Sequence, residues 1–175
     1  MNSMSLHTED LVPGSGHYLA AERINLHAFP DEQRVPLKVF FPLIEQQLVE
    51  AKCLCDGNSV VGFYVLIPDE EIRFLSFLAI APQLRSIGYG SQALKLLKAD
   101  AKNRPLVLCI EPPDKRADNF GQRLKRQAFY LRNGFHKTGH QQHIHGNLYD
   151  VLCGAKTYDR QAFLALMDTI EEHDE

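Results

Sequence analysis

The sequence predicts one α/β domain in which helices flank a mixed central sheet. Its 175 residues, 45% of them hydrophobic, suit a single domain. A chain of this length buries about 70% of its unfolded surface. The pair Asp56-Gly57 between two β-rich segments is typical of a hairpin, and so of antiparallel strands. Farther along come a strand-like segment, a glycine loop, an amphipathic segment and a short apolar segment that suits a buried parallel strand.

Two helices are expected at the beginning of the domain. Apolar residues recur at helical spacing from His17 to Ala28 and from Val35 to Leu48. Pro42 lies inside the second segment, where it must kink or restart the helix. The segment "AFPDEQRVP" links the two helices, and residues 1–16 are a candidate for a flexible N-terminal segment.

Three strands and a further helix follow. The predicted hairpin is "EAKCLCDGNSVVGFYVLI", and the third strand, "EIRFLSFLAIAP", ends at Pro82. The glycine loop then opens a helix, which Asn103 and Pro105 terminate. One face of this helix carries four apolar residues, Ala93, Leu94, Leu97 and Ala101.

The C-terminal part continues the alternation of strands and helices. "PLVLCIEPP" suits the parallel strand, and "QRLKRQAFYLRNGF" is a helix that Asn133-Gly134 closes as a left-handed pair. A second hairpin is expected from Phe135 to Cys153, and a last helix from Tyr158 to Ile170. No repeat or low-complexity segment interrupts this order, so residues 1–175 are treated as one domain.

Composition and charge narrow the classes of function. The net charge of -3 comes from scattered acids and bases, so the sequence indicates neither a nucleic-acid nor a membrane partner. It contains no apolar segment near the roughly 18 residues of a membrane span and no signal-peptide pattern, which predicts a cytoplasmic protein. The four cysteines, Cys53, Cys55, Cys109 and Cys153, form no C-x-x-C pair and are expected to be buried free thiols.

The glycine loop has the features of a phosphate site, because a loop that opens a helix presents unpaired amides and the positive end of the helix dipole. A P-loop needs Lys after its second glycine, but Ser91 follows Gly90. Gly88-x-Gly90-x-x-Ala93, with Glu111 about 20 residues later, matches the dinucleotide fingerprint. A nicotinamide-binding module therefore stays as an alternative, although the loop is long for it and an antiparallel hairpin precedes it.

A third pattern, R-x-x-G-x-G, is present at Arg85–Gly90. Together with "FLAIAP" upstream and "AFYLRNGF" downstream, it resembles the GNAT superfamily of acyl-CoA-dependent N-acyltransferases, from about Ile24 to the last helix. "AFPDEQRVP", "CIEPP" and "RQAFYLRNGF" are similar to a bacterial subgroup of small acetyltransferases. The resemblance implies a GNAT-type fold with splayed parallel strands. It also implies transfer of an acetyl or related acyl group from acetyl-CoA to a primary amine.

The resemblance also implies where coenzyme A binds. In the family the pantetheine arm lies between the two splayed strands, so the backbone of Leu78, Ala79 and Ile80 is expected to bind it. The pyrophosphate is expected to lie over the amides of Ser86, Ile87, Gly88, Tyr89, Gly90 and Ser91. Arg85 is expected to shape this loop or to help neutralise the phosphates.

The family pattern leaves the catalytic groups partly open. It implies that Tyr130 supplies a proton to the departing thiolate; the alternative is that Phe129 and Tyr130 only pack their helix on the sheet. Many members carry Glu at the position of Ser76 and Asn at that of Arg123. Glu111 is the nearest carboxylate that could act as the base, and the alternative is a structural role in which it bonds to neighbouring amides.

Four histidines gather in the second predicted hairpin, His136, His140, His143 and His145. On a strand His143 and His145 would share one face, a spacing that could hold zinc. Solvent-exposed hairpin side chains are the preferred interpretation, and no metal is expected.

Neither the acceptor nor the assembly is encoded by a recognisable motif. The acceptor pocket is expected among the first two helices, their link and the second hairpin. A catalytically silent domain that binds acyl-CoA is the alternative to an enzyme, and a homodimer is left open.

Overall fold

A computed structural model describes residues 5–29, 34–101 and 103–173 of the protein, and confirms the α/β domain with a mixed sheet. The strands are hydrogen-bonded in the order β1-β2-β3-β4-β5-β7-β6. The chain divides into two compact units, Met1–Pro68 with Leu75–Leu97, and Asp69–Phe74 with Lys98–Glu175. No helix in the described part of the chain is long and apolar enough to cross a membrane.

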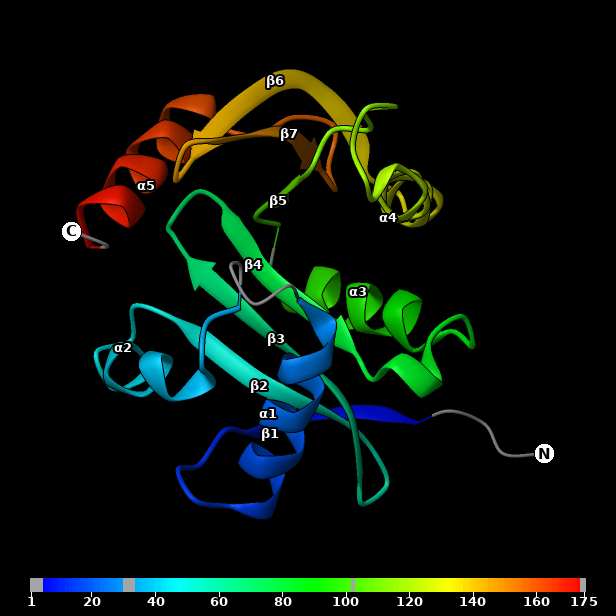
Figure 1. The fold of residues 1–175 in the computed structure, drawn as a ribbon. Coiled ribbons are helices and arrows are strands. Elements are labelled where there is room, and N and C mark those ends of the chain that lie inside the picture. The colour runs from blue at the N-terminus through cyan, green and yellow to red at the C-terminus, as the bar shows by residue number, and fades with distance from the viewer. Residues whose placement is uncertain (1–4, 30–33, 102, 174–175) are drawn as a thin grey trace. The chain divides into compact units, whose positions relative to one another are not determined.

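The first unit holds the N-terminal strands and the helices around them (Figure 1). Its elements are β1 (Leu6–Asp10), α1 (Gly16–Ala28), η1 (Leu37–Phe40), α2 (Phe41–Glu45), β2 (Glu50–Asp56), β3 (Ser59–Pro68), most of β4 (Arg73–Ile80), η2 (Pro82–Leu84) and most of α3 (Tyr89–Asp100). The predicted hairpin is confirmed, because β2 and β3 pair antiparallel and Gly57 takes φ 61° in the turn between them.

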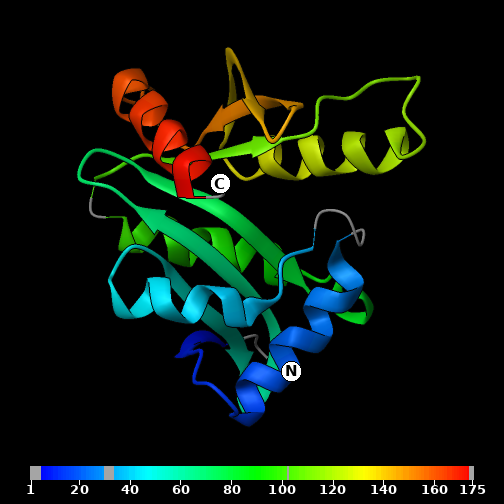
Figure 2. The same cartoon turned by 60° about the vertical axis from the view of Figure 1, so that its left-hand side comes forward.

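Helices cover both faces of the strands in this unit. Figures 1 and 2 show α1 and α2 on one face of β2 and β3 and α3 on the other. Alternate strand residues, among them Cys53, Phe63 and Val65, join Ala21 and Ile24 of α1 in a buried core. The apolar face predicted for this helix is confirmed at Ala93, Leu94 and Leu97, which are buried on α3; Ala101 is buried too but lies just after the helix ends.

The second unit contains β5 (Leu106–Ile110), α4 (Phe120–Arg132), β6 (His136–Ile144), β7 (Asn147–Cys153) and α5 (Arg160–His173). The first residues of β4 pair in parallel with β5, at Arg73↔Leu106 and Phe74↔Val107, so the predicted parallel strand is confirmed. β5 pairs antiparallel with β7, and β7 with β6, which confirms the second hairpin.

Aromatic contacts hold the helices of the second unit. The ring of Phe163 on α5 lies 6.1 Å from that of Phe74, between centroids. At the C-terminal end of α4 the Lys98 ammonium donates to the Asn133 carbonyl at 2.6 Å and lies 4.5 Å from the centre of the Phe135 ring. Burial lowers the pKa of Lys98. A cation is favourable there because helix carbonyls leave partial negative charge at that end.

Three elements differ from the sequence-based expectation. Residues 6–10 of the N-terminal segment form β1, which pairs antiparallel with β2 from Leu6↔Asp56 to Asp10↔Lys52. The second predicted helix is short, because Pro42 starts α2 afresh after η1. Of the Asn133-Gly134 pair only Gly134, at φ 86°, is left-handed, since Asn133 has φ -97°. Of the link "AFPDEQRVP", residues 30–33 lie outside the described residues.

Candidate functional site

The loop between β4 and α3 changes direction through two left-handed residues. Ser86 has φ 67° and Gly88 has φ 107°, values that glycine adopts freely and other residues rarely. The loop from Arg85 to Gly88 is exposed to solvent. An approaching ligand can therefore contact the backbone of this loop.

The beginning of α3 presents amides that the helix itself leaves unpaired. The Gln92 amide donates to the Gly88 carbonyl at 3.1 Å as the first hydrogen bond of the helix. The amides of Tyr89, Gly90 and Ser91 therefore lie ahead of the first helical hydrogen bond, at the positive end of the dipole. Such an arrangement can bind phosphate.

Arg85 ties the loop to the end of β4. Its Nε donates to the Ile80 carbonyl at 3.3 Å, while the residue as a whole is exposed. The expectation that Arg85 shapes the loop has this contact in its favour, and the rest of its guanidinium can still face an anion.

Within β4, the backbone of the predicted pantetheine-binding residues is already partly engaged. The Ala79 carbonyl lies against Gly62 of β3, where an added Cβ would overlap it. The Ile80 carbonyl accepts the hydrogen bond from Arg85. We therefore expect the remaining backbone groups of Leu78, Ala79 and Ile80 to be the ones that a ligand can use.

A hydrogen bond that the sequence analysis missed anchors the loop to the first hairpin. The Tyr89 hydroxyl donates to Asp56 Oδ2 at 2.7 Å across 33 residues of chain. This hydrogen bond raises the pKa of Tyr89. The Asp-Gly turn and the glycine loop were both visible in the sequence, but nothing local in it joins them.

In the second unit, Tyr130 is buried on α4, with 9% of its surface exposed. Its ring lies 5.1 Å from Phe129 and 5.5 Å from Phe135 in edge contacts. Burial raises the pKa of Tyr130 to about 12, so the phenol keeps its proton at neutral pH. Tyr130 therefore packs its helix and also keeps a protonated hydroxyl. A packing role and a role as proton donor are compatible in this residue.

Glu111 follows β5 and is held by arginines of α4. Its Oε2 lies 2.7 Å from Arg123 Nη2, and its Oε1 lies 3.9 Å from Arg126 Nη1. The structural interpretation of Glu111 predicted neighbouring amides as its partners, but these arginines pair with it. Arg123 also donates to the Pro112 carbonyl at 3.1 Å and to Asn119 at 2.8 Å.

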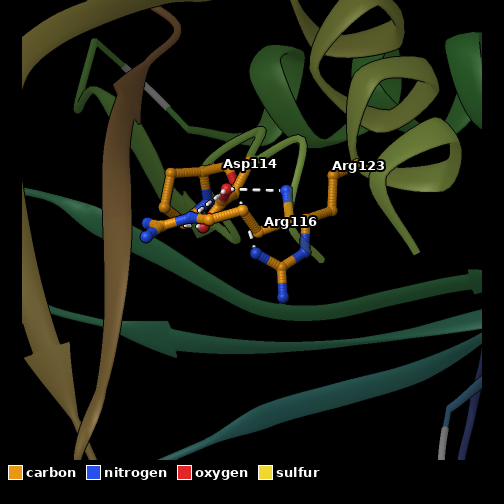
Figure 3. A network of polar contacts seen from close by, with 4 residues as sticks. Asp114, Arg116 and Arg123 are labelled. Atoms are coloured by element: carbon orange, nitrogen blue, oxygen red, sulfur yellow. Dashed lines mark hydrogen bonds and ion pairs between the residues drawn. The ribbon is translucent and has the colours of Figure 1, made fainter. Parts of the chain in front are cut away.

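A second ion pair, between Asp114 and Arg116, lies in the loop between β5 and α4 and is shown with Arg123 in Figure 3. Arg116 donates from its backbone amide at 2.9 Å and from Nε at 3.2 Å to Asp114 Oδ1. These hydrogen bonds lower the pKa of Asp114. The Arg116 side chain is 91% exposed, so this pair shapes the loop at the surface.

The histidines of the second hairpin do not converge. His136, His140 and His143 are exposed on β6, and His145 lies in the turn with φ 51°, so the expectation that His143 and His145 share a strand face is wrong. His140 Nδ1 instead lies 2.7 Å from the Tyr158 hydroxyl. Among the described residues no group of three or more His, Cys, Asp or Glu is arranged to hold a metal.

The cysteines are free thiols. Cys53, Cys55 and Cys153 are buried, while Cys109 is only partly so, which corrects the expectation of four buried thiols.

Comparison with known proteins identifies a family that matches this chain. A family model described as acetyltransferase (GNAT) family matches residues 19–135. A GNAT-family protein from Bacteroides thetaiotaomicron has a TM-score of 0.72 at 20% identity, over 94% of this chain and 95% of that one. An acetyltransferase from Thermus thermophilus scores 0.64 at 18% identity, over 87% and 98% of the two chains.

A third structure, of a GNAT family acetyltransferase from Elizabethkingia anophelis with acetyl-CoA bound, has a TM-score of 0.57 at 20% identity. It covers 87% of this chain and 98% of its own. At these identities the likeness shows a shared fold. No curated protein matches the chain.

Proposed function

The chain belongs to the acetyltransferase (GNAT) family, and from this premise we propose that it transfers an acetyl or related acyl group from acetyl-CoA to a primary amine. One observation carries the proposal: the loop from Arg85 to Ser91 exposes its backbone through left-handed residues and ends in helix amides ahead of the first helical hydrogen bond. The acetyl-CoA bound by the Elizabethkingia anophelis protein supports the same cosubstrate here.

Coenzyme A would be bound mainly through backbone groups of the first unit. The amides from Ser86 to Ser91 would contact the pyrophosphate, with Arg85 beside them as a cation. The backbone of Leu78, Ala79 and Ile80 would bind the pantetheine amides. Backbone recognition of this kind requires that side chains stay out of the way, which is the physical reason for Gly88 and Gly90.

The reaction is attack by a neutral amine on the thioester carbonyl. A C–N bond forms, the tetrahedral intermediate collapses, and the C–S bond breaks. The nitrogen loses one proton to a base, for which Glu111 or a water that it orients is our candidate. The sulfur gains one proton, for which Tyr130 is our candidate donor. Solvent then returns the base and the phenol to their starting states.

A catalytically silent acyl-CoA-binding domain is a second candidate. It is favoured by the contact of Arg123 with Glu111, which occupies the one carboxylate that we can name as a base. The glycine loop would serve such a domain equally well, so the two candidates differ only in turnover.

The deciding experiment measures free thiol released from acetyl-CoA in the presence of a panel of primary amines. Thiol release that requires both the protein and an amine supports transfer, and mass spectrometry of the N-acetylated product confirms it. Calorimetric binding of acetyl-CoA without release on any amine would establish the silent domain. Binding of NADH in place of acetyl-CoA would overturn both.

A further inference from the structure

Tyr89 belongs to the glycine loop through its backbone and to the first hairpin through its side chain. Its backbone amide is one of the three that precede the first hydrogen bond of α3. Its hydroxyl donates to Asp56 Oδ2 at 2.7 Å, at the end of β2. Because the amide and the hydroxyl belong to one residue, a hydrogen bond that holds the side chain also restricts where the amide points.

Asp56 is a firm point of attachment for this side chain. Its backbone lies between two neighbouring strands, since Asp56 pairs with Leu6 of β1 and with Ser59 of β3. Asp56, Tyr89 and the glycine loop all belong to the first unit. The hydrogen bond therefore joins two parts of one compact unit.

The loop that it holds gains little from burial. Residues 85–88 are exposed to solvent, so core packing does not fix their conformation. Ser86, at φ 67°, is left-handed, a conformation that costs a residue other than glycine free energy and persists where surrounding contacts impose it. The loop therefore depends on hydrogen bonds to keep its shape.

The bond between Tyr89 and Asp56 is suited to this task. At 2.7 Å it is shorter than the bond of 3.3 Å from Arg85 to the Ile80 carbonyl, and its acceptor is a carboxylate, which strengthens a hydrogen bond. The bond raises the pKa of Tyr89, so the phenol keeps its proton and remains the donor at neutral pH.

Resting on the proposed binding of acetyl-CoA over this loop, we infer that Asp56 is a positioning residue for the cosubstrate: through Tyr89 it holds the glycine loop in the shape that the pyrophosphate requires. Asp56 is not itself a contact for the pyrophosphate, because like charges repel. A loop that already has its binding shape avoids the cost of ordering when the ligand arrives. If the free loop had that shape only about one fifth of the time, the measured Kd would rise about fivefold.

Removing the hydroxyl alone is the first test. Tyr89→Phe should raise the Kd of acetyl-CoA, measured by calorimetry, about fivefold. In a chain that already carries Asp56→Ala, the same substitution should have no further effect, because the bond is already lost. Asp56→Asn keeps an acceptor oxygen and a residue that suits the turn before Gly57, so its Kd should stay within about twofold of wild type.

Tyr64→Phe is the matched control in the same unit. The Tyr64 hydroxyl donates to Glu50 Oε2 at 3.3 Å. Glu50 is the first residue of β2 and Asp56 the last, so the two carboxylates lie about 20 Å apart along the strand. Tyr64 is 1% exposed, and loss of its hydroxyl should lower Tm at least as much as Tyr89→Phe does. Its Kd for acetyl-CoA should nevertheless stay within about twofold of wild type.

An unchanged Kd in Tyr89→Phe, equal losses of affinity in Tyr89→Phe and Tyr64→Phe, or an Asp56→Asn variant that binds as weakly as Asp56→Ala would each overturn the positioning role of Asp56. The proposed function would stand in all three cases, because wild type would still bind acetyl-CoA. A wild-type protein that does not bind acetyl-CoA would overturn the proposed function, and this inference with it.

Discussion

Tyr130 is buried, and we propose a chemical role for it. Its pKa of about 12 lies above the ordinary value of about 8.5 for a thiol, so in the proposed role the phenol would stay protonated and would assist mainly by hydrogen-bonding to the developing thiolate. If Tyr130 does pass its proton to the sulfur, the phenolate that remains must take a proton back from solvent immediately. Ionisation of Tyr130 should therefore leave no limb in the pH profile of kcat below about pH 11.

Removing only the hydroxyl tests this role. We expect Tyr130→Phe to lower kcat by roughly 100-fold, as loss of general-acid assistance does. The edge contacts with Phe129 and Phe135 survive in the variant, so Tm and acetyl-CoA affinity should change little. Steady-state kinetics paired with a melting curve decide the matter. A kcat within about threefold of wild type would exclude the role.

Two roles are open for Glu111: the general base of the reaction, or a structural partner in the ion pair with Arg123. If it accepts the proton of the amine, Glu111→Gln should lower turnover near neutral pH, and the loss should shrink as pH rises and the amine loses its proton unaided. Kinetics from about pH 7 to pH 10 measure this. Arg123→Gln is the control, because it breaks the same ion pair and keeps the carboxylate. Equal, pH-independent losses in the two variants, with equal falls in Tm, would assign Glu111 a structural role.

At the scale of elements, the glycine loop and the first turn of α3 together form the anion site that we propose. Gly88 and Gly90 do different things within it. The φ of 107° at Gly88 means that a larger residue there strains the backbone whatever binds. Gly90 lies inside the helix, so a substitution there adds a side chain to the anion site without that strain.

Gly90→Val should therefore weaken acetyl-CoA binding at least tenfold in calorimetry, because the side chain keeps the pyrophosphate off the amides. Gly121→Val is a close control: Gly121 is likewise the second residue of its helix, α4, and an added Cβ there meets nothing within 4 Å. It carries the same change in helix propensity. Equal affinities for the two variants would rule out pyrophosphate binding over this turn.

At the scale of the whole molecule, buried thiols and a buried phenol should make the folded state less stable at high pH. Burial raises the pKa of Cys53 to about 12 and that of Cys109 to about 12 as well. Tyr130 is raised to about the same value. Each group binds its proton more tightly in the folded than in the unfolded chain. Its stabilisation is thus complete below its unfolded-state pKa and is lost as pH rises toward 12.

The Tm should accordingly stay level from about pH 7 to pH 8.5 and fall steadily from about pH 9 upward. Differential scanning calorimetry across this range measures the effect. Cys53→Ala removes one of the thiols, so its Tm should fall less steeply above pH 9. A Tm that does not change up to pH 11 would contradict the linkage.

Much of the fold could be predicted from the sequence, because turns and helices depend on residues that are close together in the chain. Asp56-Gly57 encodes a tight turn, helical spacing encodes α3, and Pro42 ends one helix and begins another. The strand β1 was not predicted, because its five residues, "LHTED", show no alternation of apolar and polar side chains. Only their pairing with β2 makes them a strand.

Apart from β1, the sequence by itself determined the order of strands and helices and the glycine loop, since each depends on residues that are neighbours in the chain. The family pattern combines three such local segments. The tertiary structure alone decided which distant groups meet. It paired Glu111 with Arg123, joined Tyr89 to Asp56 across 33 residues, and left the Gln127 oxygen buried with no hydrogen-bond partner in the described part of the chain. The physical reason is that burial and side-chain contact depend on how elements pack, whereas turns and periodicity are properties of neighbouring residues.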